Sequence, residues 1–299
     1  MDRPRDEIAV IGVGRLGSAL VKALHRNHYS IIGIVDRNIT RAEKIAQFVE
    51  AEIFSEVVFD LRDAGIIFIS VPDDEIASVV ADLNKHFKQN LISEFVFHTS
   101  GVLTSDVFDP LRKYRIAGSC FHPLQAFAGE EDDWKKFQNI YFGVEGDRAA
   151  IGKASQIIKD LKGYKVIISK ESRSMYHLAC TMASNYMVSL MLPVVDLFKK
   201  MNFSEQETLN ILYPLLSTTL SNLKHRGTEG ALTGPISRGD VGTIIKHLET
   251  LSYHFPAYKS IYQLHGKLLL NLKSVCDKIP MEKYLDIMKL LNGEGLKYD

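Results

Sequence analysis

Cysteine is scarce in this chain, with three residues among 299, and no two of them stand close enough to form a C-x-x-C pair. The three are Cys120, Cys180 and Cys276. Because such a pair is lacking, the sequence predicts neither a structural zinc site nor a redox disulfide. We interpret the cysteines as reduced thiols of a cytoplasmic protein. No histidines or carboxylates cluster with the spacing of metal ligands, so we expect no metal site.

An excess of one charge is also lacking, since Lys and Arg total 36 and Asp and Glu total 36. This balance argues against a general nucleic-acid-binding protein. No apolar run approaches the ~20 residues that a bilayer requires. The most apolar helical segment, 187–197, is short and contains Asp196. The polar N-terminus has no signal-peptide pattern. We therefore expect a cytoplasmic protein with no membrane or nucleic-acid partner.

What the first 169 residues do contain is an alternation of short apolar runs with segments of helical spacing. The runs typical of buried strands are 7–11, 31–35, 66–71, 95–98, 116–120, 139–144 and 165–168. The helical segments are 16–26, 41–50, 75–87 and 148–161. This alternation predicts βαβ units, and therefore an α/β fold with a doubly wound, mostly parallel sheet of the Rossmann type.

From residue 170 onward the pattern is helical only. We expect helices over 172–200, 205–224, 241–251, 257–272 and 280–291, with a capping box at Ser204 and Glu207. A chain of this length favours two domains, and the change of pattern places their boundary at 169/170. The apolar runs 187–197 and 211–220 provide more apolar face than one small layer needs, so we expect a homodimer formed through the helical domain.

The first strand ends in a glycine-rich turn with the spacing G-x-G-x-x-G. Gly12 permits the tight turn, Gly14 lets a pyrophosphate approach the backbone, and Gly17 lets the next helix pack closely on the sheet. The N-terminus of that helix, at Arg15 and Leu16, offers unpaired N–H groups and a partial positive charge to phosphates. A strand–turn–helix context makes this a dinucleotide fingerprint, so we expect these five residues to bind NAD or NADP.

The second strand ends in two residues that favour different cofactors. Asp36 lies where an acid can bind the ribose hydroxyls of NAD. Arg37 lies where a guanidinium can bind the 2′-phosphate of NADP, and Arg41 could add a second charge. We expect NADP, with NAD as the open alternative.

Three residues at the end of the strand over 66–71 are expected to border the same cofactor. Val71, Pro72 and Asp73 lie at the carboxyl edge of the sheet, where ligands of doubly wound folds bind. Asp73 could instead only cap the helix that begins at residue 74 or 75.

Candidate catalytic residues follow two further strands at this edge. His98 and Ser100 end one strand, and His122 follows the next. A histidine can donate a proton near neutral pH, although each of these side chains could equally hold a loop in shape. We expect Ser100 and His122 to lie beside the nicotinamide.

A polar stripe on the long helix provides the opposite wall. His177, Thr181 and Asn185 recur every four residues in an otherwise apolar helix, so they share one face. Neutral polar side chains suit a ligand cleft better than a solvated face, and we expect His177 and Asn185 to act in catalysis. In a later loop, Arg238 could bind a carboxylate or phosphate, and Asp240 is expected to cap the helix that follows.

Four motifs occur in one order: GVGRLG at 12–17, HTSG at 98–101, FHPLQ at 121–125 and LTGPISRGD at 232–240. In this combination the chain resembles Rossmann-like proteins that carry a C-terminal domain of unknown function 2520. It is more distantly similar to pyrroline-5-carboxylate reductase, ketopantoate reductase and 3-hydroxyisobutyrate dehydrogenase. The resemblance implies an NADP-type oxidoreductase with a helical dimerisation domain. In the hydroxyisobutyrate group a Lys and an Asn on the first long helix serve the substrate; Asn185 matches that Asn, whereas Thr181 stands in place of the Lys.

These observations together predict a cytoplasmic NAD(P)-dependent oxidoreductase. It would transfer hydride between the nicotinamide and a carbonyl or imine carbon of a small polar metabolite. Residues 1–169 would bind the cofactor, and residues 170–299 would serve the substrate and the dimer. The alternative is a non-catalytic protein that binds NAD(P) and senses its redox state.

Overall fold

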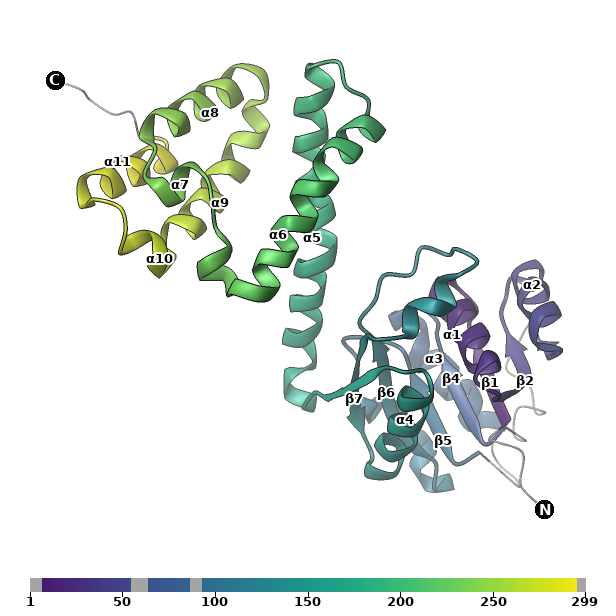
Figure 1. Cartoon of the computed structure of the whole chain (residues 1–299). Coiled ribbons are helices and arrows are strands. Elements are labelled where there is room, and N and C mark those ends of the chain that lie inside the picture. The colour runs from purple at the N-terminus through teal and green to yellow at the C-terminus, as the bar shows by residue number, and fades with distance from the viewer. Residues whose placement is uncertain (1–6, 55–63, 87–92, 295–299) are drawn as a thin grey trace. The chain divides into compact units, whose positions relative to one another are not determined.

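The computed structural model describes residues 7–54, 64–86 and 93–294 (Figure 1). The chain divides into two compact units, Met1–Met187 and Val188–Asp299. This division falls inside helix α5 (Arg173–Lys200), so the first turns of α5 belong to the unit that contains the sheet. The change from strands and helices to helices only comes earlier, after strand β8 (Tyr164–Ile167).

The described residues of the first unit form one sheet of eight strands. They are β1 (Glu7–Ile11), β2 (Ser30–Val35), β3 (Glu52–Phe54), β4 (Ile66–Ile69), β5 (Phe95–His98), β6 (Ala117–Pro123), β7 (Tyr141–Gly146) and β8. Their order is β3-β2-β1-β4-β5-β6-β7-β8, and only the β6–β7 pair is antiparallel. The predicted mostly parallel, doubly wound sheet is confirmed, and β3 is an additional strand that the apolar pattern does not reveal.

Helices cover both faces of this sheet. Helices α1 (Arg15–Arg26), α2 (Ile39–Val49) and α4 (Arg148–Asp160) pack on one face, against a cluster that includes Ile8 and Val10. Helix α3 (Asp73–His86) and the 3-10 segment Ser105–Tyr114 pack on the other, against Ala9 and Ile11. Because alternate residues of a strand point to opposite faces, β1 is buried on both sides, which explains its continuous apolar run.

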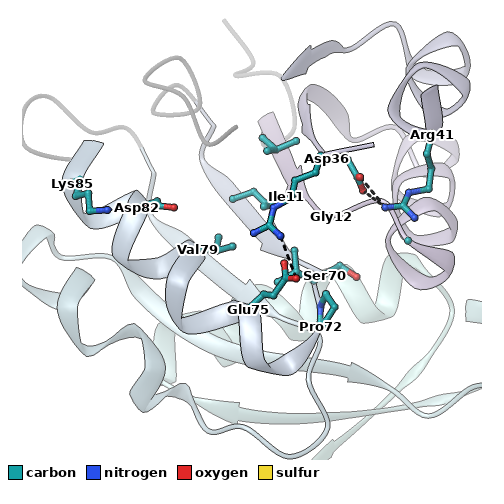
Figure 2. A pocket seen from close by; sticks show the side chains of 14 residues that line it. Ile11, Gly12, Asp36, Arg41, Ser70, Pro72, Glu75, Val79, Asp82 and Lys85 are labelled. Carbon is teal, nitrogen blue, oxygen red and sulfur yellow. Dashed lines mark hydrogen bonds and ion pairs between the residues drawn. The ribbon is translucent and has the colours of Figure 1, made fainter. Parts of the chain in front are cut away.

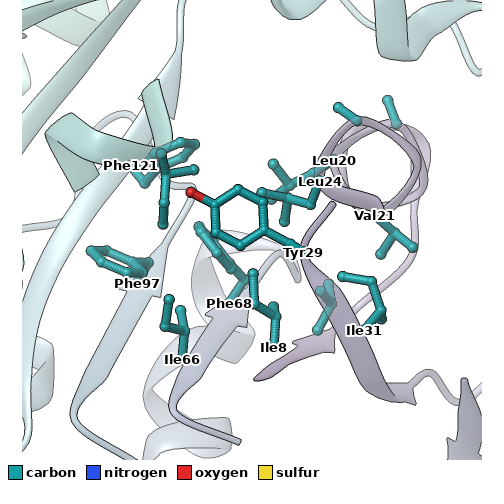
Figure 3. Packing of buried hydrophobic residues seen from close by; sticks show 14 of the residues in the cluster. Ile8, Leu20, Val21, Leu24, Tyr29, Ile31, Ile66, Phe68, Phe97 and Phe121 are labelled. Atoms are coloured by element: carbon teal, nitrogen blue, oxygen red, sulfur yellow. The ribbon is translucent and has the colours of Figure 1, made fainter. Parts of the chain in front are cut away.

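Aromatic side chains fill the centre of the first face. Figure 3 shows Leu20 and Leu24 of α1 with Tyr29 beside the sheet residues Phe68, Phe97 and Phe121. The ring of Phe68 stacks on that of Phe97 at 5.0 Å and meets that of Phe121 edge-on at 5.2 Å. This packing fixes strands β4, β5 and β6 side by side, and the loops at their carboxyl ends are thereby held together.

Two strand ends differ from the sequence prediction. Strand β4 ends at Ile69, two residues early, because the chain at Ser70 turns past the backbone of Gly12. Strand β6 continues to Pro123, three residues beyond its predicted end, because antiparallel β7 pairs with it there. His122 is therefore a strand residue and not a loop residue. Helix α3 begins at Asp73, and the last residue predicted for it, Phe87, lies outside the described residues.

The described part of the second unit is entirely helical. After α5 come α6 (Glu205–Ala231), α7 (Pro235–Arg238), α8 (Val241–His254), α9 (Lys259–Leu270), α10 (Lys273–Cys276) and α11 (Met281–Asn292). Helices α7 to α11 bury a core that includes Ile236, Ile244 and Leu270. The predicted capping box is confirmed: the amide of Glu207 donates to Ser204 Oγ at 3.2 Å, and the amide of Ser204 donates to Glu207 Oε2 at 2.8 Å.

Among the described residues, one helical stretch, Lys170–Lys200, is long and apolar enough to cross a membrane by length and composition. The sequence-based expectation that no segment reaches this threshold was wrong. It required an unbroken apolar run, whereas the mean hydropathy of 1.5 tolerates the interspersed Ser, Thr and Asn. Only 6% of its most apolar window is buried, so the helix presents a large apolar surface.

Candidate active site

A cavity of about 810 Å³ lies at the carboxyl edge of the sheet, beside the glycine turn (Figure 2). Six of the predicted cofactor residues line it: Gly12, Gly14, Asp36, Arg37, Val71 and Pro72. Arg41 lines it as well. Doubly wound sheets bind nucleotides at this edge, so the cavity lies at the position expected for a nucleotide site.

The three glycines of the turn have the conformations that the fingerprint requires. Gly12 has a φ of 89°, and a Cβ there would lie 2.5 Å from the Ser70 carbonyl oxygen. A Cβ on Gly17 would overlap the Gly12 carbonyl oxygen, so α1 approaches the turn only because residue 17 is glycine. Gly14 differs, since no described atom lies within 4 Å of a Cβ built there. Gly14 thus leaves open space on the cavity side of the turn.

The other predicted cofactor residues do not line the cavity with their side chains. Arg15 is the exposed first residue of α1, and Leu16 packs against the core. Asp73 is the first residue of α3 and not its cap, because the Glu75 amide donates to the Pro72 carbonyl. In the first turn an acid still complements the positive end of the helix dipole. The structure therefore gives these three predictions no side-chain support at the cavity.

Asp36 is the most constrained residue of the cavity, with 6% of its surface exposed. Its Oδ2 accepts from the Val13 amide and its Oδ1 from the Asn38 amide, both at 2.8 Å. Nη2 of Arg41 donates to Oδ1 at 2.8 Å and to Oδ2 at 3.0 Å. Burial raises the pKa of Asp36, but the hydrogen bonds from Arg41, Asn38 and Val13 outweigh it and the pKa is lowered. Asp36 is therefore ionised, and its charge is offset by Arg41.

Arg37 is held far more loosely. Its side chain is 79% exposed, and Nη1 lies 3.4 Å from Oε1 of Glu75, which also lines the cavity. An exposed pair of this kind contributes little to stability. Arg37 is therefore free to turn toward a ligand, whereas Arg41 is already fixed at the cavity by Asp36.

A second group of predicted residues meets where α5 packs on β6 and on the loop after β5. The rings of His122 and His177 lie edge to face with centroids 6.0 Å apart. A Cβ on Gly101 would overlap Cδ2 of His177 and lie 3.0 Å from Nε2 of His122. Gly101, the glycine of the HTSG motif, therefore leaves the space that both imidazole rings occupy.

Tyr176 completes this cluster. Its hydroxyl hydrogen-bonds Nδ1 of His122 at 2.9 Å. Gly143 is the cross-strand neighbour of His122, and a Cβ at Gly143 would overlap the Tyr176 hydroxyl. Because residue 143 is glycine, there is room for the Tyr176 hydroxyl to reach His122.

Ser100 and His98 serve the loop and the core. The Ser100 hydroxyl accepts from the amides of Val102 at 3.2 Å and Leu103 at 3.0 Å, and the residue is only 4% exposed. His98 is fully buried against Phe108, and burial together with the charge of Arg173 lowers its pKa to about 3. This geometry favours a loop-holding role for Ser100 over a role in proton transfer.

Arg173 is a residue that the sequence analysis missed. It is fully buried; its Nη2 donates to the Ser100 carbonyl at 2.7 Å and to Cys120 Sγ at 2.8 Å. Its Nη1 is buried and has no hydrogen-bond partner among the described residues. Lys170 and Glu171 precede it in the sequence, so the pattern indicated an ordinary charged helix start. Tyr176 was missed because it lies one position off the predicted stripe.

The buried charge of Arg173 acts on His122. Burial, then the charge of Arg173 and then that of His177, lower the pKa of His122 to about 4. Burial is also the main reason that the pKa of the Tyr176 hydroxyl is raised. His122 and Tyr176 are therefore both uncharged at neutral pH. Their hydrogen bond joins two neutral groups.

The structure does not bring the whole predicted stripe into this cluster. Asn185 is exposed and lies eight residues beyond His177, about 12 Å along the helix axis. In the second unit Arg238 is exposed, and Asp240 caps α8 as predicted by accepting from the Thr243 amide at 3.1 Å. Within the described ranges no group of three His, Cys, Asp or Glu residues is arranged to hold a metal ion.

Comparison with known proteins identifies both parts of the chain. Residues 1–123 match the model of Rossmann-like domains, and residues 140–268 match the domain of unknown function DUF2520. The chain thus matches the same two families that its motifs indicated. A search of curated proteins finds no significant match.

Solved structures share the fold over almost their whole length. A Bacteroides fragilis protein to which NADP oxidoreductase activity is ascribed is 24% identical, with a TM-score of 0.73 over 89% of this chain and 98% of that one. A Thermotoga maritima protein is 25% identical, with a TM-score of 0.66 over 90% and 98%. A pyrroline-5-carboxylate reductase from Coxiella burnetii is 12% identical, with a TM-score of 0.57 over 92% and 99%. These likenesses establish the fold that the chain shares with reductases.

Proposed function

We propose that the chain is an NADP-dependent oxidoreductase that reduces a carbonyl or imine carbon. The observation that carries this proposal is the 810 Å³ cavity between the glycine turn and the Asp36–Arg41 pair. It offers open backbone at Gly14 for a pyrophosphate and a fixed guanidinium for a ribose phosphate. Structures with a similar fold include a protein described as an NADP oxidoreductase and two reductases with NADP bound, which supports this proposal.

The Asp36–Arg41 pair supports NADP over NAD. An acid at the end of the second strand selects NAD when it is free to accept the ribose hydroxyls. Here four hydrogen bonds already engage the Asp36 carboxylate, and Arg41 offsets its charge. The 2′-phosphate of NADP would meet the Arg41 guanidinium, with the mobile Arg37 as a second partner.

In the proposed reaction, hydride leaves C4 of the reduced nicotinamide with two electrons and forms a C–H bond with the carbonyl or imine carbon. The oxygen or nitrogen takes up a proton, and NADP⁺ remains. The His122–His177 cluster stands at the carboxyl edge of the sheet and supplies the polar groups for this step. Ser100 and Asn185 are the remaining predicted catalytic residues, and their geometry supports them less.

We also propose that the protein is a soluble homodimer in which a second copy covers α5 and α6. Large apolar side chains are exposed along both helices, among them Met175, Leu178, Val188, Leu192, Tyr213 and Leu215. An exposed apolar surface of this extent marks an interaction site. A symmetric pair of identical faces is the commonest way to cover such a surface.

The function is tested by measuring NADPH and NADH binding by calorimetry and then screening carbonyl and imine metabolites for NADPH oxidation. We expect submillimolar NADPH binding and turnover of at least one substrate. His122→Ala and His177→Ala should each reduce turnover by roughly 10²–10⁴-fold and leave cofactor affinity nearly unchanged. Tight NADPH binding without turnover of any compound would favour the redox-sensing alternative, and absence of binding would refute both.

A further inference from the structure

The groups that face the His122–His177 cluster carry permanent charge of one sign only. Arg173, Tyr176 and His177 face His122 from α5, Cys120 lies beside it on β6, and His98 lies on β5. Of these groups only Arg173 carries a permanent charge, and it is positive. It is fully buried, so water screens it little.

No carboxylate neutralises this guanidinium within the described ranges, where Arg173 forms no ion pair. Its donors meet the carbonyls of Ser100 and Leu103 and the thiol of Cys120, and Nη1 meets no acceptor. The acid closest in register is Glu145, the cross-strand neighbour of Cys120. Its carboxylate accepts from the Ser105 amide at 2.8 Å and the Ser105 hydroxyl at 2.7 Å, which holds it on the 3-10 segment. Burial raises the pKa of Cys120 and the charge of Glu145 adds to this, but Glu145 forms no ion pair with Arg173 among the described residues.

A buried cation without a counter-ion imposes a positive potential on the reacting centre. Burial is the largest cause that lowers the pKa of His122 to about 4, and the charge of Arg173 is the second, because a positive field disfavours a second cation. A bound substrate experiences the same field as the imidazole.

The two substrate types left open above respond to such a field in opposite ways. When hydride reaches a carbonyl carbon, the C=O electron pair moves to the oxygen and negative charge develops there, which a positive field stabilises. An imine is reduced as the protonated iminium, so it must bring a positive charge into the site, and hydride then neutralises that charge. The field opposes binding of the iminium, and the relief when hydride neutralises its charge only returns what binding has cost.

We propose that the substrate is a carbonyl compound that is neutral or anionic when it binds, and not a protonated imine. This inference rests on the proposed function and separates the chain from the imine reductases that share its fold. Arg173 sets the sign of the potential, and it acts on the substrate through its electric field without touching it.

The probes for this inference are cyclopentanecarboxylate and cyclopentylammonium, which have the same ring and opposite charges. Each is titrated into the protein with and without NADP⁺, and binding is followed by the Cε1–H NMR signals of His122 and His177. We expect the carboxylate to move these signals at a concentration about tenfold lower than the ammonium ion. Equal affinity, tighter binding of the ammonium ion, or no movement of either signal would overturn the inference.

Two variants identify the source of the preference. Arg173→Met removes the charge at nearly constant length and should abolish the preference for the carboxylate, whereas Arg173→Lys should retain it. Backbone amide spectra show whether each variant folds, and if Arg173→Met does not, the wild-type comparison still decides. Because binding is measured without NADP⁺ as well, a protein that fails to bind cofactor refutes the proposed function while it still reports the charge preference.

Discussion

Arg41 donates to both carboxylate oxygens of Asp36, at 2.8 and 3.0 Å, from a position that lines the proposed cofactor cavity. We expect Arg41→Ala to weaken NADPH binding by about 1.5–3 kcal/mol, the value of a charged hydrogen bond. NADH, which lacks the 2′-phosphate, should lose much less. Calorimetry with both cofactors measures the difference.

Arg37→Ala is the matched comparison, since Arg37 lines the same cavity but is exposed and only loosely paired with Glu75. It should weaken NADPH binding more than NADH binding, but by less than Arg41→Ala. Equal losses for both cofactors in Arg41→Ala would show that Asp36 and Arg41 do not select NADP.

The glycine turn gives a pair of substitutions with opposite outcomes. Gly14→Val places a side chain in open space at an ordinary φ of −62°, so the fold should survive while NADPH binding is lost. Gly17→Ala instead drives a Cβ into the Gly12 carbonyl and should destabilise the unit by about 1–3 kcal/mol. Thermal unfolding and calorimetry on both variants separate the two effects. A folded Gly14→Val protein with unchanged affinity contradicts the cofactor assignment.

Much of the fold could be predicted because its signals are local. The apolar runs at 7–11 and 66–71 and the G-x-G-x-x-G spacing each indicate a buried strand or a phosphate-binding turn within a few residues. Strand β3 was missed because three residues at the end of a sheet carry too short a pattern. The end of β6 was misplaced because it depends on pairing with β7, which lies some 20 residues further along the chain.

The site was predicted less completely because it is made by tertiary contacts. Helical spacing put His177 and Asn185 on one face, but it gave no reason to separate His177, which lies beside His122, from the exposed Asn185. The roles of Gly101 and Gly143 depend on rings that come from α5. Arg173 is important because its charge is buried, and a sequence does not show that a cation at the start of a helix is buried.

Acidification should destabilise the fold through two histidines, the buried His98 and the half-buried His122. The pKa of His98 is lowered to about 3 and that of His122 to about 4, against about 6.5 for an unfolded histidine. Above pH 6.5 both rings are neutral in both states. Between pH 6.5 and the folded values only the unfolded chain binds these protons, so the free energy of unfolding falls as the pH falls.

At pH 5 each histidine should cost about 2 kcal/mol relative to pH 7.5, at 1.36 kcal/mol per pKa unit. Urea unfolding at the two pH values gives this difference for the wild type. His98→Leu and His122→Leu should each reduce it by about 2 kcal/mol. Should both variants lose as much stability as the wild type between these pH values, the histidines are not the groups responsible.

The apolar surface of α5 and α6 predicts the state of assembly. Val188 and Leu192 are 67% and 62% exposed, and they stand one turn apart on α5. If a second copy covers this surface, Val188→Glu and Leu192→Glu should each convert a dimer to a monomer, because a buried unpaired carboxylate opposes association.

Met281→Glu is the control, since Met281 is 70% exposed on α11, outside α5 and α6. Light scattering should give twice the mass of one chain for the wild type and for Met281→Glu, and the mass of one chain for the two α5 variants. A wild-type protein that is a monomer at micromolar concentration would refute the dimer proposal. If that monomer also floats with lipid vesicles, the apolar surface binds a membrane instead.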